Sequence, residues 1–239
     1  MPADAVGSGA RDRLLLALDL DDEVAAHRVA HELREWFGVI KVGLELFSAA
    51  GPAVVQSMID EGFEVFLDLK LADIPTTVRK ASKVLGALGV KYLTIHASGG
   101  PVMLRAGVDG LAEGAQRAGL EPPKVLAVTV LTSESGFPDH LVATRVAAAV
   151  EARCAGVVCA AGEVAQVKQL APRMLTVVPG IRPAGSSRDD QARAATPAEA
   201  LMAGADLLVV GRAVTAAADP RAAAAALCEE VASAAGASR

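Results

Sequence analysis

Short apolar stretches alternate with longer amphipathic stretches along the chain, and this alternation predicts its secondary structure. The apolar stretches have the length and the Val, Leu and Ile content of buried β-strands. We predict eight strands: Arg13–Leu20, Val39–Gly43, Glu64–Lys70, Lys91–His96, Lys124–Leu131, Gly156–Ala161, Leu175–Ile181 and Leu207–Gly211. The amphipathic stretches predict one helix after each strand: Asp22–Phe37, Glu45–Glu61, Pro75–Leu88, Pro101–Ala118, Asp139–Arg153, Glu163–Leu170, Pro197–Met202 and Val214–Ala235.

Eight strand–helix units in 239 residues fit one (β/α)8 TIM barrel domain that spans residues 1–239. An open, doubly wound α/β sheet is the alternative fold. The turn after the first strand, residues 18–22, lacks the glycine fingerprint with which such sheets bind dinucleotides. We therefore expect the barrel, with residues 1–10 flexible because nothing in them predicts packing.

The stretch from Phe66 to Pro75 places charges at the end of a strand. Asp68 and Lys70 are two residues apart, so their side chains point to the same face of the strand. Burying such charges without partners would cost free energy. The pair therefore indicates an acid and a base that face a pocket, and Asp73 follows just beyond the strand.

Further polar residues fall at the carboxyl ends of the predicted strands, where barrels carry their active sites. They are Asp19, Lys41, His96, Thr132, Ser133, Arg182, Gly211 and Arg212. The loops after strands seven and eight of barrels frequently bind phosphate, and arginines with a glycine backbone N–H suit an anion. The polar loop over residues 183–195 predicts a lid that closes over the ligand.

Composition narrows the class of protein. A net charge of −5 without a basic patch argues against a nucleic-acid partner. Cys154, Cys159 and Cys228 lack paired spacing, which indicates a reducing compartment. The sequence shows no signal-peptide pattern and no apolar run of about 18 residues. We therefore expect a cytoplasmic protein without membrane association.

Two histidine patterns have more than one interpretation. His27 and His31 are four residues apart on a predicted helix, which is a spacing that metal ligands use. No third ligand accompanies them and the helix lies outside the barrel, so a solvated helix face and no metal site are expected. His96 either lines the pocket or is a core histidine with its hydrogen bonds satisfied.

Together these residues resemble the orotidine 5′-phosphate decarboxylase family in its shorter bacterial form. The frame Asp68-x-Lys70-x-x-Asp73 alone also occurs in sugar-phosphate lyases of the same superfamily. The match extends over nearly the whole chain, in the family's order, through these segments: Leu18-Asp19, Lys41-Val42-Gly43, Ile74-Pro75-Thr76-Thr77-Val78, His96-Ala97-Ser98-Gly99-Gly100, Thr129-Val130-Leu131-Thr132-Ser133, Pro179-Gly180-Ile181-Arg182-Pro183, Asp189-Asp190-Gln191 and Val210-Gly211-Arg212.

The resemblance implies cofactor-independent decarboxylation of orotidine 5′-phosphate to UMP and CO2 in de novo pyrimidine biosynthesis. It implies four catalytic residues, of which Lys70 protonates C6: Lys41, Asp68, Lys70 and Asp73. It implies substrate contacts with the ribose, the reacting carboxylate, the pyrimidine and the phosphate: Asp19, Lys41, Asp68, Thr132, Arg182, Gln191, Gly211 and Arg212. It also implies a homodimer in which Asp73 and Thr77 reach the neighbouring subunit's site.

Two other functions stay open. A metal-dependent sugar-phosphate lyase, such as 3-keto-gulonate-6-phosphate decarboxylase or hexulose-phosphate synthase, would use the same Asp-x-Lys-x-x-Asp frame. A catalytically silent nucleotide-phosphate-binding barrel would bind the ligand without converting it. The alternating charges of Lys41, Asp68, Lys70 and Asp73 argue against the silent barrel, because binding alone does not need them.

Overall fold

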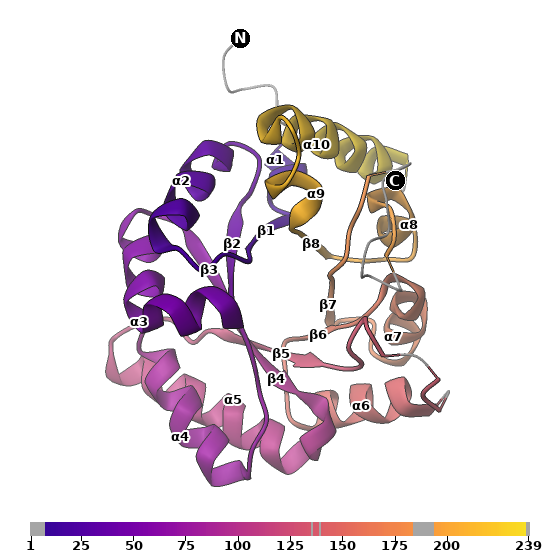
Figure 1. Cartoon of the computed structure of the whole chain (residues 1–239). Coiled ribbons are helices and arrows are strands. Elements are labelled where there is room, and N and C mark those ends of the chain that lie inside the picture. Colours follow the sequence, from indigo (N-terminus) through magenta and orange to yellow (C-terminus); the bar gives the residue numbers. More distant parts are fainter. Residues whose placement is uncertain (1–7, 135, 139, 184–193, 238–239) are drawn as a thin grey trace.

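Eight parallel strands close into a barrel in sequential order, with the last strand paired to the first (Figure 1). The computed structural model describes residues 8–134, 136–138, 140–183 and 194–237. The strands are β1 (Leu14–Leu18), β2 (Val39–Gly43), β3 (Glu64–Leu71), β4 (Tyr92–His96), β5 (Lys124–Val128), β6 (Gly156–Val158), β7 (Leu175–Val178) and β8 (Leu207–Val210). The predicted TIM barrel is confirmed, and the open sheet is ruled out.

Helices form a layer around the barrel (Figure 1). They are α1 (Ser8–Arg11), α2 (Glu23–Leu33), α3 (Leu44–Asp60), α4 (Pro75–Gly86), α5 (Gly100–Arg117), α6 (His140–Glu151), α7 (Val164–Leu170), α8 (Pro197–Met202), α9 (Arg212–Thr215) and α10 (Pro220–Ala237), with short 3₁₀ turns η2 (Ala97–Gly99) and η3 (Ala161–Glu163). None of the described helices combines the length and the apolar character needed to cross a lipid bilayer.

Strand side chains alternate between the barrel interior and the helix layer. Leu15 and Ala17 of β1 belong to the interior cluster, whereas Leu14, Leu16 and Leu18 pack with the helices. The strand is therefore apolar on both faces, as buried parallel strands are. The same alternation explains the site, because an interior position recurs at every second residue. Asp19, Lys41 and Asp68 continue the interior rows of Ala17, Val39 and Phe66 towards the carboxyl ends of the strands.

Five strands end earlier than the apolar pattern predicts, β1 by two residues and β8 by one. β5, β6 and β7 each stop three residues short of the predicted end. The apolar residues that follow these strands line a cavity instead: Val130, Leu131, Cys159 and Pro179. The apolar pattern continues past the strands because the cavity wall is itself partly apolar.

The predictions for the two ends of the chain were wrong in part. A single helix over Val214–Ala235 was expected, but α9 ends at Thr215 and α10 begins at Pro220. Proline suits the first turn of a helix, and the Asp219 carboxylate accepts the Ala222 N–H at 3.0 Å. At the other end, residues 8–11 form α1 with Ala10 buried, although flexibility was expected through residue 10. Residues 1–7 lie outside the described part of the chain.

Glycines allow α4 and α5 to approach closely. A Cβ atom at Gly110 of α5 would overlap the carbonyl oxygen of Arg79 in α4, and one at Gly114 would overlap that of Lys83. Gly86 of α4 has the same relationship to the Leu111 carbonyl oxygen. The two helices therefore pack backbone against backbone. This packing fixes α4, the helix that directly follows the charged end of β3.

Candidate active site

A cavity of about 360 Å³ opens at the carboxyl ends of the strands. It has an apolar floor formed by barrel-interior residues that include Ala17, Phe66, Val128, Val158 and Val209. Eight of the predicted site residues line it: Asp19, Lys41, Asp68, Lys70, Thr132, Arg182, Gly211 and Arg212. The barrel thus brings together residues that are spread over almost two hundred positions of the sequence.

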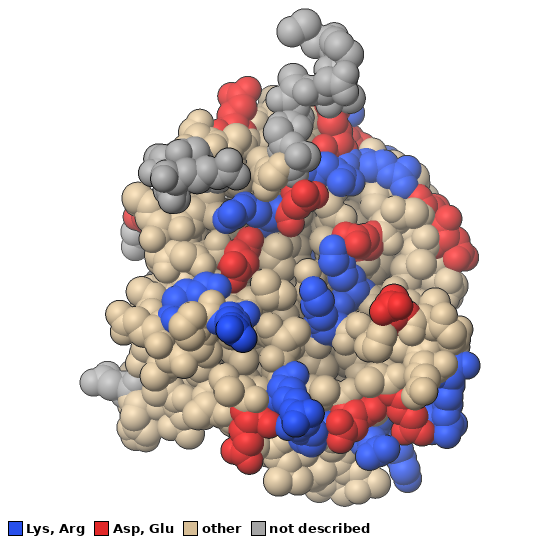
Figure 2. Space-filling view, turned by 180° about the vertical axis from the view of Figure 1, so that it is seen from behind, with Lys and Arg blue, Asp and Glu red and all other residues tan. Residues whose placement is uncertain are grey.

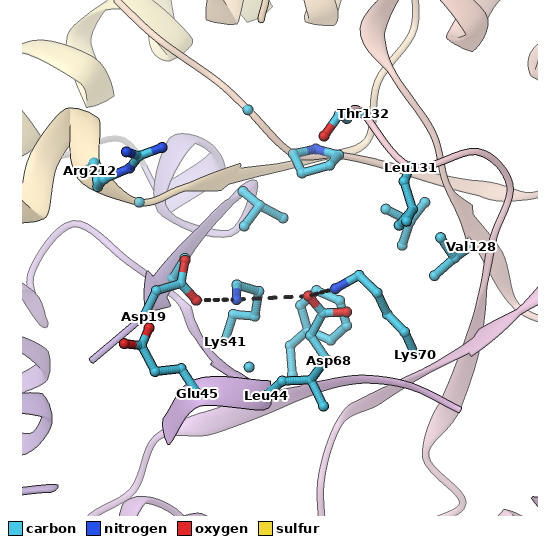
Figure 3. A pocket seen from close by; sticks show the side chains of 18 of the residues that line it. Asp19, Lys41, Leu44, Glu45, Asp68, Lys70, Val128, Leu131, Thr132 and Arg212 are labelled. Atoms are coloured by element: carbon cyan, nitrogen blue, oxygen red, sulfur yellow. Dashed lines mark hydrogen bonds and ion pairs between the residues drawn. The ribbon is translucent and has the colours of Figure 1, made fainter. Parts of the chain in front are cut away.

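Four charged side chains form a continuous chain along one wall of the cavity (Figure 3). The Lys41 ammonium donates to Asp19 Oδ1 at 2.8 Å and lies 3.8 Å from Asp68 Oδ2. The Lys70 ammonium donates to the same Asp68 oxygen at 2.6 Å. Lys41 and Asp68 are 7% and 9% exposed, so both charges are buried and each has an opposite charge beside it. A buried charge without such a partner would be strongly unfavourable.

Asp73 and Thr77 lie outside this cavity. Both side chains are exposed, and the Asp73 carboxylate accepts the N–H of the next residue, Ile74, at 2.6 Å. Within this chain the charge series therefore ends at Asp19 and Lys70 and does not include Asp73. The prediction that Asp73 and Thr77 reach the site of a neighbouring subunit requires both side chains to be exposed, as they are.

The backbone of β3 is irregular where it carries Lys70. Lys70 has φ = 50°, in the left-handed region that residues other than glycine rarely adopt. Leu67 of β3 pairs with Leu93 of β4, and Leu71 pairs with Ile95. The strand β3 therefore advances four residues where β4 advances two. The predicted shared face of Asp68 and Lys70 is confirmed by their ion pair. A bulge that the sequence does not reveal presents the lysine.

Thr94 of β4 stabilises this bulge and escaped the sequence-based prediction. Its hydroxyl is fully buried, accepts the Lys70 backbone N–H at 2.9 Å and donates to Asp68 Oδ1 at 2.9 Å. It thereby replaces the backbone hydrogen bond that Lys70 would make in a regular strand. A polar residue within the apolar stretch Lys91–His96 was the available clue, because buried hydroxyls need partners.

Gly43 is a second residue with an unpredicted role. A Cβ atom there would lie 2.8 Å from the Lys41 ammonium and 3.2 Å from Asp19 Oδ1. Its backbone is extended, with φ = −94°, so no special conformation requires glycine. The missing side chain leaves the space that the Lys41–Asp19 ion pair occupies.

The residues that were predicted to bind an anion lie at the far end of the cavity. Gly180, with φ = 76°, turns the chain after β7, and Arg182 follows with its guanidinium buried and donating to the Ile181 carbonyl at 3.3 Å. Among the described residues, no carboxylate lies within 4 Å of that guanidinium. Gly211 and Arg212 begin the short helix α9, an arrangement typical of barrel phosphate sites.

The ends of the predicted lid are fixed to each other. Ile181 and Ala195 form a parallel bridge, and the Arg182 N–H donates to the Ala195 carbonyl at 3.0 Å. The loop therefore leaves and rejoins the barrel at one place beside Arg182. Gln191 and most of the predicted lid, residues 184–193, lie outside the described residues.

Two further predicted residues, Thr132 and His96, differ in whether they line the cavity. Thr132 lies across the cavity from Asp68 (Figure 3). His96 is half-buried and is not among the residues that line the cavity. Burial, followed by the positive charges of Lys70 and Arg145, lowers the pKa of His96 below its ordinary value of 6.5. The imidazole is therefore neutral at neutral pH.

Of the described carboxylates that line the cavity, Asp19 and Asp68 pair with lysines, and Glu45 is the third. These described side chains do not form a cluster of three metal-ligating groups. The one cluster of three such side chains in the described part of the chain is His27, His31 and Glu61, outside the barrel.

Comparisons with known proteins identify the family of this chain. A family model described as "Orotidine 5'-phosphate decarboxylase / HUMPS family" matches residues 12–227. The chain is 43% identical to an orotidine 5′-phosphate decarboxylase of Moorella thermoacetica, over 93% of each protein. It is 46% identical to that of Anaeromyxobacter dehalogenans, over 90% of this chain and 96% of the relative. The crystal structure of orotidine 5′-phosphate decarboxylase from Lactobacillus acidophilus superposes with a TM-score of 0.75 at 36% identity, covering 92% of this chain and 99% of that one. The resemblance inferred from the sequence is confirmed, and the chain belongs to the orotidine 5′-phosphate decarboxylase / HUMPS family.

Proposed function

We propose that this chain converts orotidine 5′-phosphate to UMP and CO2 without a cofactor, with Lys70 as the proton donor. The observation that carries the proposal is the Lys70–Asp68 ion pair, 2.6 Å long, on the wall of a cavity that has Arg182 and Arg212 at its far end. The names of the relatives that match most of the chain support the same reaction.

The reaction needs stabilisation of negative charge at C6. When the C6–carboxylate bond breaks, CO2 leaves and the electron pair remains on C6. A fixed ammonium group beside C6 stabilises that pair and then donates a proton to it, which forms the C6–H bond of UMP. Lys70 has an ammonium group at the cavity wall, held by Asp68.

Asp68 also acts on the substrate in this proposal. Two like charges about 4 Å apart interact by roughly 4 kcal/mol at an effective dielectric constant of ~20. Repulsion between Asp68 and the substrate carboxylate is relieved as CO2 leaves. Lys41, which lies between Asp19 and Asp68, offsets part of this negative charge and holds Asp19 for contact with the ribose hydroxyls.

The remaining contacts orient the substrate. Thr132 faces the pyrimidine, while Arg182, Gly211 and Arg212 bind the 5′-phosphate, with Gln191 from the lid. Phosphate binding at a distance from C6 contributes orientation and closure of the site. Arg212→Ala should accordingly reduce kcat/KM mainly through KM, and an unchanged kcat/KM would exclude its phosphate role.

The proposal includes a homodimer in which Asp73 and Thr77 enter the partner's cavity. The exposure of both residues, and of the large apolar side chain of Ile74 beside them, supports it. Mixing inactive Lys70→Ala and Asp73→Ala chains tests it. If the sites are shared, random exchange restores about one quarter of the complete sites, because half of the dimers are hybrid and each has one intact site. Absence of restored activity in verified hybrids would show that each chain uses its own Asp73.

The direct test is the ultraviolet change when orotidine 5′-phosphate is mixed with purified protein. We expect rapid conversion that survives EDTA. Lys70→Ala should abolish turnover while UMP binding stays measurable, and near-wild-type turnover in that variant would eliminate Lys70 as the acid. Absence of conversion at high enzyme concentration would favour the sugar-phosphate lyase or the silent barrel, and conversion that survives EDTA argues against the metal-dependent lyase. Binding without conversion would favour the silent barrel.

The proposal places the enzyme in the cytoplasm, without a nucleic-acid partner. On the face shown in Figure 2, acidic and basic side chains are interspersed and do not form one extended basic surface. The three cysteines are free and buried, which suits a reducing compartment. Burial raises the pKa of Cys154 to about 12 and that of Cys228 to about 11, so both thiols stay protonated.

A further inference from the structure

The helices α2 and α3 lie on the outside of the barrel (Figure 1). Three metal-ligating side chains meet between α2 and the end of α3. His27 and His31 are on successive turns of α2, and Glu61 follows the last residue of α3. One ligand atom from each residue lies within 4.8 Å of the other two. The sequence suggested only the histidine pair. The third group comes from thirty residues further along the chain.

Both imidazole rings point at the same carboxylate oxygen. His27 Nδ1 lies 3.0 Å and His31 Nε2 lies 2.8 Å from Glu61 Oε2. A carboxylate oxygen offers only lone pairs, so each nitrogen needs a proton on this side or a cation between it and the oxygen. One small cation coordinated by all three atoms satisfies the whole cluster.

The second nitrogen of His27 is held in the way that metal-bound histidines usually are. His27 Nε2 lies 3.0 Å from the Ser57 hydroxyl, and that hydroxyl lies 3.1 Å from the Val54 carbonyl. When Ser57 donates to the carbonyl, it accepts the Nε2–H of His27, and Nδ1 presents its lone pair towards Glu61. Outer hydrogen bonds of this kind fix the tautomer and ring orientation of histidine ligands.

We propose that His27 Nδ1, His31 Nε2 and Glu61 Oε2 bind a zinc ion. Two imidazoles and one carboxylate form a zinc ligand set, with water in the fourth tetrahedral position. Mg²⁺ and Ca²⁺ prefer oxygen ligands, so the two imidazoles disfavour them. Zinc–ligand distances of about 2.0–2.1 Å place tetrahedral ligands about 3.3 Å apart. The two distances from the imidazole nitrogens to Glu61 Oε2, 3.0 and 2.8 Å, therefore have to lengthen by only a few tenths of an ångström. The two nitrogens lie within 4.8 Å of each other, and the exposed His31 side chain has room to adjust to the zinc ion.

The position of the proposed zinc site indicates that the ion stabilises the fold and takes no part in the reaction. Glu61 lies in the connection from α3 to the start of β3, at the amino ends of the strands, whereas the cavity opens at their carboxyl ends. Barrels react at the carboxyl face, and features of the opposite face contribute to stability. Zinc joins α2 to this connection and stabilises the folded chain by binding it in preference to the unfolded chain. The proposal does not depend on the decarboxylase assignment.

The test titrates the full chain, freed of metal with a chelator and dialysed, with Zn²⁺ against a chromophoric chelator. The variants are His31→Gln and Glu61→Gln, and the matched control is His140→Gln, which removes an exposed histidine of α6. We expect one zinc ion per chain in the wild type and in the control, and at least tenfold weaker binding in both cluster variants. Zinc should raise the unfolding temperature of the wild type and the control only, and Mg²⁺ should not replace it.

Two results would overturn the proposal. One is a wild-type chain that binds no zinc at micromolar concentration. The other is zinc bound equally well by the wild type, His31→Gln and Glu61→Gln, which would place the ion elsewhere. Far-ultraviolet circular dichroism checks that each variant is folded. His31 is exposed, so His31→Gln keeps the test decisive if Glu61→Gln is unstable.

Discussion

The buried hydroxyl of Thr94 donates a 2.9 Å hydrogen bond to Asp68, the carboxylate that holds the Lys70 ammonium. The same hydroxyl accepts the Lys70 backbone N–H. One side chain on β4 therefore fixes both the Asp68 carboxylate and the backbone of Lys70 on β3. Thr94 itself does not line the cavity, so it acts on the reaction by positioning these two residues.

Replacing Thr94 with valine should separate positioning from packing. Valine has nearly the same shape but leaves the Lys70 N–H and one Asp68 oxygen without a partner, which costs about 1–3 kcal/mol of folding free energy. We expect kcat to fall about tenfold or more with little change in KM, because the ammonium loses its fixed position. Urea unfolding and steady-state kinetics measure the two effects.

Thr94→Ser is the matched control for that prediction, since it keeps the hydroxyl and removes only a methyl group. It should retain most of the wild-type kcat. If the valine variant keeps the wild-type kcat, the hydroxyl is not responsible. If the serine variant loses as much activity as the valine variant, the hydroxyl alone is not sufficient and the methyl group is needed as well.

Gly43→Ala should damage the site without damaging the fold. The added Cβ atom would lie 2.8 Å from the Lys41 ammonium, so the lysine has to move away from Asp19. Displacement of a site residue by about 1 Å can reduce the rate about 100-fold. We therefore expect kcat/KM to fall by about 10- to 100-fold with an unchanged unfolding temperature. Gly9→Ala is the control, because a Cβ atom there meets no other atom within 4 Å.

Most of the fold was predictable from the sequence because a parallel barrel repeats a local pattern. The bounds of β2 and α8 were predicted to the residue. The segment Val39–Gly43 is short and largely apolar, Pro197–Met202 is a short capped helix, and both have clear ends. The predicted end of β5 lies beyond the observed end, and the reason is physical. Residues beyond Val128 stay apolar because they line the cavity, and hydrophobicity alone cannot distinguish these two environments.

The sequence reveals those site residues whose type alone suggests their chemistry. It does not reveal features that depend on which residues become neighbours in the folded chain. Asp68 and Lys70 are conspicuous because charges are rare in an apolar strand. The bulge at Lys70 is not conspicuous, because it depends on Thr94, twenty-four residues away. Glu61 was missed as a partner of His31 for the same reason. Only the folded chain brings such pairs together.

Gly110→Ala should destabilise the fold strongly. The new Cβ atom would overlap the Arg79 carbonyl oxygen, a backbone atom that cannot move without shifting α4. Overpacking of this kind costs typically about 1–3 kcal/mol or more. We expect a lower unfolding temperature, measured by calorimetry. Gly162→Ala, which adds its Cβ atom in open space, should leave the unfolding temperature near the wild-type value.

His96 should make the folded chain less stable in mild acid. Burial, with the charges of Lys70 and Arg145, lowers its pKa in the folded state, against the opposing effects of Glu134 and Asp68. In the unfolded chain the imidazole titrates near its ordinary pKa of about 6.5. As the pH falls through that value, the unfolded state binds a proton that the folded state does not. The free energy of unfolding must therefore decrease, until the pH drops below the folded-state pKa.

His96→Gln removes this titration and isolates its contribution. The free energy of unfolding is measured in urea for both proteins at about pH 7.5 and about pH 5.5, which bracket the ordinary histidine pKa. The wild type should lose more stability between the two values than His96→Gln. The remaining titrating groups are common to both proteins, so the difference between the two losses belongs to His96. An equal loss in both would mean that the folded protein binds the His96 proton as readily as the unfolded chain does.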